Sequence, residues 1–243
     1  LVISAQTDSI NDSTGLSNTA EPPQLTNAVD DAIFIQVTQS ANNTGIVSGI
    51  SITTPTGYTL LSDVQDAELR TFIFYKRSTG SETIPAISSS LRSEWTCSTV
   101  VLTDVDWNNG GIVQNVSNTG NGDMQSLSLT TSTQGNASAI LCFYALERRQ
   151  CQGFRFPDTR TSTTFLSTAS SGVIEGVSNC SASGFDFIYD RNALWSGPFW
   201  EASSPGDSVA INIEVLVQGN IIPLQSATYV KQNAPSNTLQ LTM

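Results

Sequence analysis

The sequence predicts an all-β protein built from antiparallel, jelly-roll-like sandwiches, and three observations support this. Hydroxyl side chains are abundant, with 33 Ser and 28 Thr in 243 residues, and β-branched Thr, Val and Ile fit the pleated surface of a sheet. Short apolar stretches alternate with turn sequences along the chain. No stretch of about 12 residues keeps the 3.6-residue apolar period of an amphipathic helix. We therefore expect very little helix.

The expected strands are apolar or alternating stretches bounded by clusters of Gly, Asn, Ser, Thr and Pro, where Gly and Asn tolerate the positive φ angles of turns. In one such cluster, we expect Pro55 and Gly57 to fix a turn and Tyr58 to cap the sandwich. The expected strands cover residues 33–38, 48–53, 59–62, 70–77, 96–105, 126–132, 139–146, 184–189, 208–218 and 226–231.

The two halves of the chain resemble each other. The apolar stretch beginning at Ile33 is similar to the one beginning at Ile140, and the stretch leading to Arg77 is similar to the one leading to Arg191. The offset between these matched positions drifts only from 107 to 114 residues, as loops of different length in two copies would produce. We therefore expect two sandwiches in tandem. The alternative is one large two-sheet sandwich whose strands resemble one another by chance.

The predicted domains meet in a Gly- and Asn-rich stretch, residues 106–123. On this division the chain has an N-terminal sandwich, a divergent second sandwich, and a terminal strand or arm that reaches a neighbouring subunit. These three parts cover residues 1–112, 113–218 and 219–243.

The net charge argues against nucleic acid as a partner, and the short apolar runs argue against a membrane. The chain has 10 Lys and Arg against 21 Asp and Glu, giving a net charge of -11. A phosphate backbone needs a basic footprint that this chain lacks, so we expect no nucleic-acid binding. The longest apolar run, residues 139–146, has eight residues, whereas a transmembrane helix needs about 18. We therefore expect no membrane insertion.

The chain has no His, which excludes Ser-His-Asp and Cys-His catalysis and His-ligated zinc. The enzymatic alternative is a glycoside hydrolase that uses two carboxylates on a sandwich rim. Acidic residues on such rims are usually solvated, so we expect a non-enzymatic protein without a cofactor. The carboxylates considered for that alternative are Asp104, Asp106, Glu147, Asp186, Glu201 and Glu214.

Two acidic stretches were weighed as calcium ligands. Asp104, Asp106 and Asn108 stand at alternate positions, and Asp30 and Asp31 are adjacent. Neither stretch approaches the spacing of a twelve-residue calcium loop. We therefore expect plain turns and no bound metal.

Aromatic residues are the candidate binding groups. Trp195, Phe199 and Trp200 surround a Gly-Pro turn, and Trp107 follows a predicted strand. Aromatic rings on loops can stack on sugar rings or anchor an interface. The alternative for Trp200 is that it fills the core, as we expect for Trp95.

The four cysteines fall into two pairs. Cys97 and Cys142 lie inside apolar strand-like runs, where a free thiol behaves as a small hydrophobic group. Cys151 and Cys180 flank a polar, loop-rich insertion and could form a disulfide, although sequence alone does not settle connectivity.

Four segments together resemble a pattern that recurs in bacteriophage virion proteins, in which a Pro-x-Gly-Trp-Thr-Leu-Leu turn lies between apolar strands. Here Tyr58 replaces the usual Trp, and Asp30 replaces a Gly. The matching segments read DAIFIQV, PTGYTLL, FIFYKRSTGSE and WTCSTVVLTDVD.

The resemblance implies a structural protein on the virion surface, as capsid decoration, fibre or tail component, that assembles with other virion proteins and with copies of itself. It implies no catalytic residues. The alternative function is a carbohydrate-binding module or adhesin that attaches to a host surface glycan.

Overall fold

The computed structural model confirms an all-β, antiparallel fold. It describes the backbone of residues 3–10, 17–40, 49–121, 123–132, 137–146, 151–155, 164–174, 177–188, 194–195, 199–202, 206–218 and 238–241. It describes side chains within residues 18–39, 49–90, 95–121, 123–132, 137–146 and 206–218. Among these described residues, no helix is long and apolar enough to span a bilayer.

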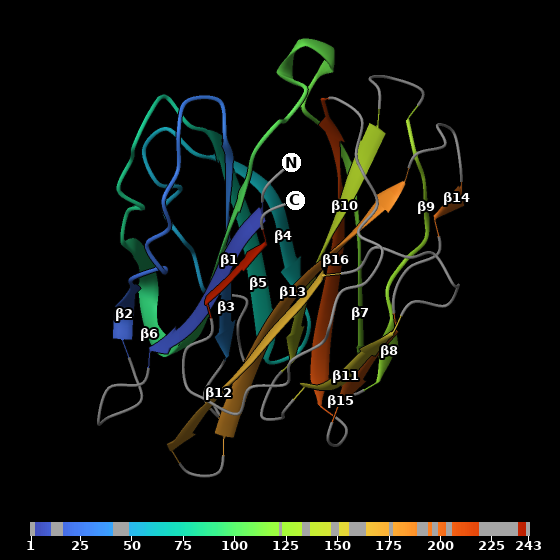
Figure 1. The fold of residues 1–243 in the computed structure, drawn as a ribbon. Helices are drawn as coiled ribbons and strands as arrows, with labels where there is room; N and C mark the ends of the chain where they lie inside the picture. The colour runs from blue at the N-terminus through green and yellow to red at the C-terminus, as the bar shows by residue number, and fades with distance from the viewer. Residues whose placement is uncertain are drawn as a thin grey trace.

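The first sheet contains the strands of the N-terminal half (Figure 1). Its order is β17-β1-β6-β3-β5-β4, and β2 pairs with β6 beside this path. The strand nearest the C-terminus, β17, pairs with β1 of the same chain. The members are β1 (Ile3–Ile10), β2 (Ser17–Ala20), β3 (Ala32–Ser40), β4 (Thr59–Gln65), β5 (Leu69–Arg77), β6 (Ile87–Leu102) and β17 (Thr238–Leu241).

The second sheet has the order β12-β13-β10-β16-β7. Two smaller sheets, β11-β15-β8 and β14-β9, accompany it, and Figure 1 labels their strands. The larger strands are β7 (Ile112–Asn121), β10 (Ala137–Leu146), β12 (Thr164–Ile174), β13 (Val177–Ile188) and β16 (Asp207–Val217). The smaller ones are β8 (Met124–Gln125), β9 (Leu129–Thr130), β11 (Cys151–Arg155), β14 (Leu194–Trp195) and β15 (Phe199–Ala202). A short 3-10 helix, η1 (Trp107–Asn109), precedes β7.

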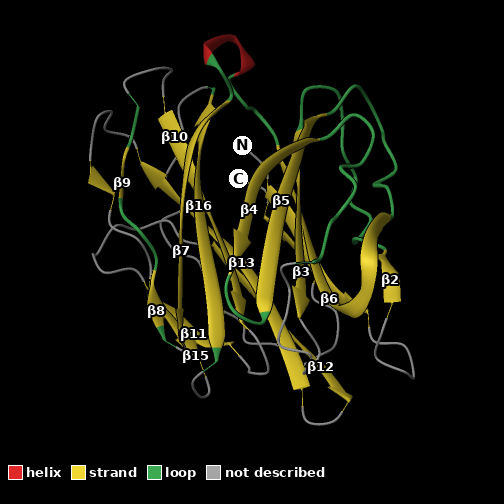
Figure 2. Cartoon of the chain, turned by 180° about the vertical axis from the view of Figure 1, so that it is seen from behind, coloured by secondary structure: helices red, strands yellow, loops and turns green. Residues whose placement is uncertain are grey.

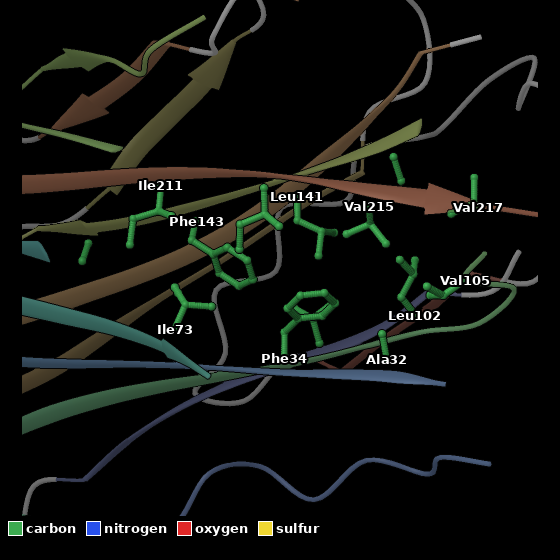
Figure 3. Packing of buried hydrophobic residues seen from close by; sticks show 14 of the residues in the cluster. Ala32, Phe34, Ile73, Leu102, Val105, Leu141, Phe143, Ile211, Val215 and Val217 are labelled. Carbon is green, nitrogen blue, oxygen red and sulfur yellow. The ribbon is translucent and has the colours of Figure 1, made fainter. Parts of the chain in front are cut away.

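The main core lies between the two sheets. Alternate residues of β10 and β16 point toward alternate residues of β3, β5 and β6, as expected from the two-residue period of a strand. Figure 3 shows Phe34 of β3 near Phe143 of β10, and their ring centroids are 6.4 Å apart. Residues on both sides of the predicted boundary therefore share one core. A single large sandwich requires such a core, and the tandem and jelly-roll descriptions stay predictions.

The outer face of the first sheet is also buried. Phe74 and Trp95 point away from the second sheet into an apolar cluster completed by chain segments outside the sheet. One of these segments is the predicted turn, in which Tyr58 N donates to Pro55 O at 3.0 Å and Gly57 has a φ of 82°. The turn and the capping position of Tyr58 are thus confirmed. We call this layer of covering side chains the apolar cover; it includes Ala20, Ile50, Tyr58, Ile84 and Ile87.

The outer face of the second sheet is covered by residues 123–132, which are held by hydrogen bonds from side chains of the sheet. The amide nitrogen of Asn212 donates to Leu127 O at 2.8 Å, and that of Asn118 donates to Gln125 O at 2.9 Å. We call residues 123–132 the polar cover. Within residues 126–132, only Leu129–Thr130 form a strand, so the prediction of a strand over 126–132 is wrong in extent.

Glu214 anchors the polar cover. Its side chain is fully buried, and it accepts hydrogen bonds from Ser138 Oγ at 2.5 Å, Gln114 Nε2 at 2.6 Å and Ser132 N at 2.9 Å. A buried carboxylate is costly unless such donors surround it. The strand β10 beneath is therefore buried on both faces, which explains its unbroken apolar sequence.

Several strand predictions need correction. Residues 49–53 form no strand, and only Ile52 makes an isolated bridge to Ser89; this segment belongs to the apolar cover and is followed by Pro55, which has no N–H to donate. The strand β7, which begins at the expected boundary, was not predicted because its sequence is polar. The polar sequence reflects the position of β7 at the edge of the second sheet. The strand expected over 226–231 lies outside the described residues.

Candidate functional site

A pocket lies at one end of the sandwich, where segments of both halves meet. Its volume is about 330 Å³, and η1, the red element at the top of Figure 2, belongs to this end. The lining residues come from the loop before β3, the end of β5, the segment after β6 and the residue after β16. They are Val29, Asp30, Asp31, Arg77, Thr103, Asp104, Val105, Trp107, Asn108 and Gln218.

Backbone hydrogen bonds fix the segment after β6 to the end of β16. Asp106 N donates to Leu216 O at 2.8 Å, Leu216 N donates to Gly111 O at 2.7 Å, and Gln218 N donates to Asp104 O at 2.7 Å. The chain therefore crosses from the first sheet to the second as an ordered segment that is hydrogen-bonded to the end of β16. This connection positions one wall of the pocket.

Trp107 is held by contacts within the chain. Its indole nitrogen donates to Asp30 O at 2.7 Å, and the guanidinium carbon of Arg77 lies 5.3 Å from its ring centroid, a cation–π distance. A Cβ atom on Gly111 would lie 2.5 Å from Trp107 Cε3, so only Gly permits this approach. Trp107 therefore supports the pocket wall, and its predicted stacking on a sugar stays a prediction.

Asp30 and Arg77 form an ion pair at the mouth of the pocket. Arg77 Nε donates to Asp30 Oδ1 at 2.9 Å, and Nη2 lies 2.8 Å from the same oxygen. Since both side chains are more than half exposed, at 53% and 57%, the pair adds little stability. Within the described part of the chain, Asp30 Oδ2 and Arg77 Nη1 have no hydrogen-bond partner, so each is available to a ligand.

Asp31 lies deeper than Asp30. Its Oδ2 accepts a hydrogen bond from Ala28 N at 2.7 Å. Burial raises the pKa of Asp31, and the charges of Asp104 and Asp30 raise it further, whereas the bond from Ala28 lowers it. The net effect is a raised pKa, so this end of the molecule holds closely spaced negative charges that oppose ionisation of Asp31.

Of the acidic residues considered as calcium ligands, Asp30, Asp31 and Asp104 line the same pocket, and Asp106 does not. Asp104 accepts from Thr103 Oγ1 at 3.0 Å, whereas buried Asp106 accepts from Asn109 Nδ2 at 2.7 Å inside the η1 turn. No three His, Cys, Asp or Glu side chains of the described residues lie where they could hold a metal ion together.

The other predicted aromatics lie outside the residues whose side chains are described. Trp195 belongs to β14, and Phe199 and Trp200 belong to β15. Backbone pairing places Trp195 opposite Leu129 and Phe199 opposite Gln125, so both strands adjoin the polar cover. Their roles in binding or in the core stay predictions.

The cysteine predictions divide in the same way. Cys97 and Cys142 are free and buried, as expected. Cys151 in β11 and Cys180 in β13 have described backbones only, so their disulfide stays a prediction.

Two of the carboxylates considered for a glycoside hydrolase, Asp186 of β13 and Glu214 of β16, pair with the same residue of β10, Ile140, on its two sides. Glu214 is buried under the polar cover and Asp104 lines the pocket. The side chains of Glu147, Asp186 and Glu201 lie outside those described.

The pocket also contains residues that sequence analysis missed. Arg77 and Gln218 were not assigned a binding role, because 140 positions of chain separate them and no local motif connects them. The local signals for this place in the fold were the acidic pair at Asp30 and Asp31 and the stretch that contains Asp104, Trp107 and Asn108.

A second surface of interest is formed by β4 and β7, which end the orders of their respective sheets. Asn115 Nδ2 on β7 donates to Leu61 O on β4 at 3.4 Å. The register of β4 shifts between Leu60 and Ser62, and Leu60 is 41% exposed. We call this pair of neighbouring strands the edge seam.

No family model, curated protein or solved structure matches the chain. The resemblance to bacteriophage virion proteins therefore stays a prediction from short sequence motifs.

Proposed function

We propose that the protein is a non-enzymatic structural component of a bacteriophage virion, exposed at the particle surface as capsid decoration, fibre or tail component. The observation that carries this proposal is where the matching segments lie. All four contribute to the neighbouring strands β6-β3-β5-β4 or the turns beside them. The resemblance thus covers a connected structural unit with its own apolar cluster, rather than scattered strands.

The partners in this proposal are other virion proteins and further copies of the chain. The main core and the two covers bury large parts of both sheets, so assembly would use edges and loop ends. The edge seam is the favoured contact because edge strands present unpaired backbone groups. The register shift in β4 disrupts simple addition of a strand, so a neighbour would pack on side chains such as Leu60.

The charge of the molecule also fits this role. A net charge of -11 opposes association with nucleic acid, and a hydroxyl-rich exterior makes contacts that are less sensitive to salt than ion pairs. The contacts of the protein would therefore be with protein neighbours rather than with packaged nucleic acid.

The direct test is the location of the chain. Particles released by the source cells would be purified on a density gradient and labelled with an antibody against this protein. We expect the chain to cosediment with intact particles and the label to appear on their exterior. Recovery of the chain only from non-particulate fractions would contradict the proposal.

A matched pair of variants tests the contact surface. Leu60→Glu places a charge in the edge seam, whereas Leu127→Glu alters a similarly exposed side chain, 46% exposed, on the polar cover. We expect Leu60→Glu to lower incorporation into particles at least tenfold and Leu127→Glu to leave it unchanged. Equal incorporation of the two folded variants would refute the role of the seam.

A further inference from the structure

We propose that the pocket at the end of the sandwich binds one neutral sugar residue of a glycan. This site goes beyond the proposed assembly function and does not depend on it. The pocket combines hydrogen-bond donors, acceptors and apolar surface from four separate segments of the chain.

The size of the pocket fits a small polar ligand. Its volume of about 330 Å³ lies at the lower end of the range of roughly 300–1,000 Å³ for small-molecule sites. One sugar ring with a few bridging waters would occupy it, whereas a long peptide or a folded partner would not enter. The rest of a glycan would extend into solvent through the open mouth.

The hydrogen-bonding groups of the pocket suit hydroxyl groups better than a purely anionic or purely cationic ligand. Arg77 Nη1 is a donor without a partner in the described residues, and the side-chain amides of Asn108 and Gln218 have no hydrogen bond to those residues either. Asp30 Oδ2 is a free acceptor beside them. Each sugar hydroxyl both donates and accepts, so it can use neighbouring groups of both kinds.

The apolar part of the pocket complements the C–H faces of a sugar ring. Val29 is 62% exposed at the rim and presents an apolar side chain there. The half-buried edge of Trp107 adds aromatic surface beside it. Such a mixture of a few apolar atoms with directed polar groups is typical of orienting sites for small ligands.

Charge argues against the other ligand classes. Asp30 and Asp31 outnumber Arg77 among the charges that line the pocket, so phosphate and acidic sugars would be repelled. The described residues do not gather the carboxylates as metal ligands. A simple organic cation would be attracted by the carboxylates but would leave the donors of Arg77, Asn108 and Gln218 unused.

The site is held in place before a ligand arrives. Asp30 is fixed by its own N–H bond to Ser78 O at 2.9 Å, by the bond from Trp107 to its carbonyl, and by the ion pair with Arg77. Its φ of 70° is unusual for a residue other than Gly. Preorganisation of this kind lowers the entropic cost of binding.

The test uses the full chain and saturation-transfer NMR with glucose, galactose, mannose and N-acetylglucosamine as separate probes. Phosphate, calcium chloride and spermidine serve as comparison ligands, detected by competition and by changes in tryptophan fluorescence. We expect at least one of the four sugars to give a saturable signal, with no competition from phosphate or calcium.

A double variant locates that signal. Asn108→Ala with Gln218→Ala removes two exposed amides from the pocket, and the loss of two hydrogen bonds should weaken sugar binding about tenfold. The matched control, Asn121→Ala with Gln65→Ala, removes two exposed amides from the ends of β7 and β4. We expect the control to bind as the unaltered chain does, and circular dichroism to show both variants folded.

Three results would overturn the proposal: silence of all four sugars, equal sugar binding by the two double variants, or binding of spermidine or calcium alone. These outcomes are separable from the assembly function. The pocket variant should still enter particles normally, so loss of sugar binding and loss of incorporation are independent results.

Discussion

The two sheets of this molecule are covered on their outer faces by different physical means. The apolar cover contributes Ile50 and Ile84 to the buried cluster that contains Trp95 of the first sheet. The polar cover is attached to the second sheet through hydrogen bonds from Ser132 N to Glu214 and from Asn212 Nδ2 to Leu127 O.

Both arrangements exclude water from the sheet beneath. The apolar cover also has hydrogen bonds, such as those from Arg70 Nη1 to Ile50 O and from Gln24 Nε2 to Ile84 O, but its buried contacts with the sheet are made by apolar side chains. The polar cover instead meets its sheet through buried donor and acceptor atoms.

This difference determines how each cover should respond to change. Apolar burial is non-directional and scales with the area removed from water, so the apolar cover should tolerate swaps that keep volume. A buried hydrogen-bond network loses stability when one member is removed, because donors lose their acceptor in a place that water does not reach. The four predictions below separate these responses.

The largest effect is expected at the centre of the apolar cover. Trp95 is fully buried, so Trp95→Ala should lower the free energy of unfolding by about 3–5 kcal/mol through lost burial and a residual cavity. Urea denaturation followed by circular dichroism measures this. Trp95→Phe should lower the free energy of unfolding by less than half as much, because Phe fills most of the same volume. Equal losses for the two variants would show that buried apolar volume is not what stabilises this cluster.

The next effect concerns the polar cover. Glu214→Ala removes the acceptor of three hydrogen bonds and should cost about 3 kcal/mol, at about 1 kcal/mol for each. Glu214→Gln keeps one acceptor oxygen in the same volume and should cost about 1 kcal/mol. The same urea midpoints provide the comparison. Equal losses in the two variants would show that the cover is held by packing rather than by its hydrogen bonds.

A smaller effect is expected where the chain passes from one sheet to the other. Gly111 has a φ of 63°, and an added Cβ would collide with Trp107, so Gly111→Ala should cost about 2 kcal/mol. Gly80→Ala is the control, because Gly80 has a φ of 157° but no atom within 4 Å of the added Cβ. It should cost no more than about 1 kcal/mol. Thermal unfolding compares the stability of the two variants. A larger loss of stability for Gly80→Ala than for Gly111→Ala would show that the collision with Trp107 is not the cause.

The smallest effect at neutral pH is expected for Tyr58→Phe. The Tyr58 hydroxyl is buried without a hydrogen-bond partner in the described residues, so its removal should change stability by less than about 1 kcal/mol. At high pH the difference grows. Burial, with a smaller contribution from the charge of Glu82, raises the pKa of Tyr58 to about 12, above the ordinary value of about 10.

The sign of the pH effect follows from linkage. Since the unfolded chain ionises this phenol at lower pH than the folded chain, the contribution to stability is complete below about pH 10 and is lost as pH rises toward 12. Urea midpoints measured across this window should fall more steeply for the unaltered protein than for Tyr58→Phe. Urea midpoints that fall equally in both proteins would contradict this expectation. So would a tyrosinate absorbance change for Tyr58 near the ordinary pKa of a tyrosine.

Sequence patterns located strands where the local pattern matched the final environment. β10 carries the long apolar run of residues 139–146 because it is buried on both faces, and β5 was found with nearly its observed bounds. β7 was missed because its Asn-rich sequence bonds to the polar cover and to β4. Residues 49–53 looked like a strand because Ile50 and Ile52 are apolar, but they cover a sheet rather than join one.

The sequence by itself determined the all-β class, the burial of the free cysteines Cys97 and Cys142, and the turn at Gly57, since these depend on local composition, strand period and backbone conformation. Only the tertiary structure decided that both halves share one core, and that Arg77 and Gln218 line one pocket. The physical reason is that pairing and packing join residues far apart in the chain, and no pattern within a short window records which distant partners will meet.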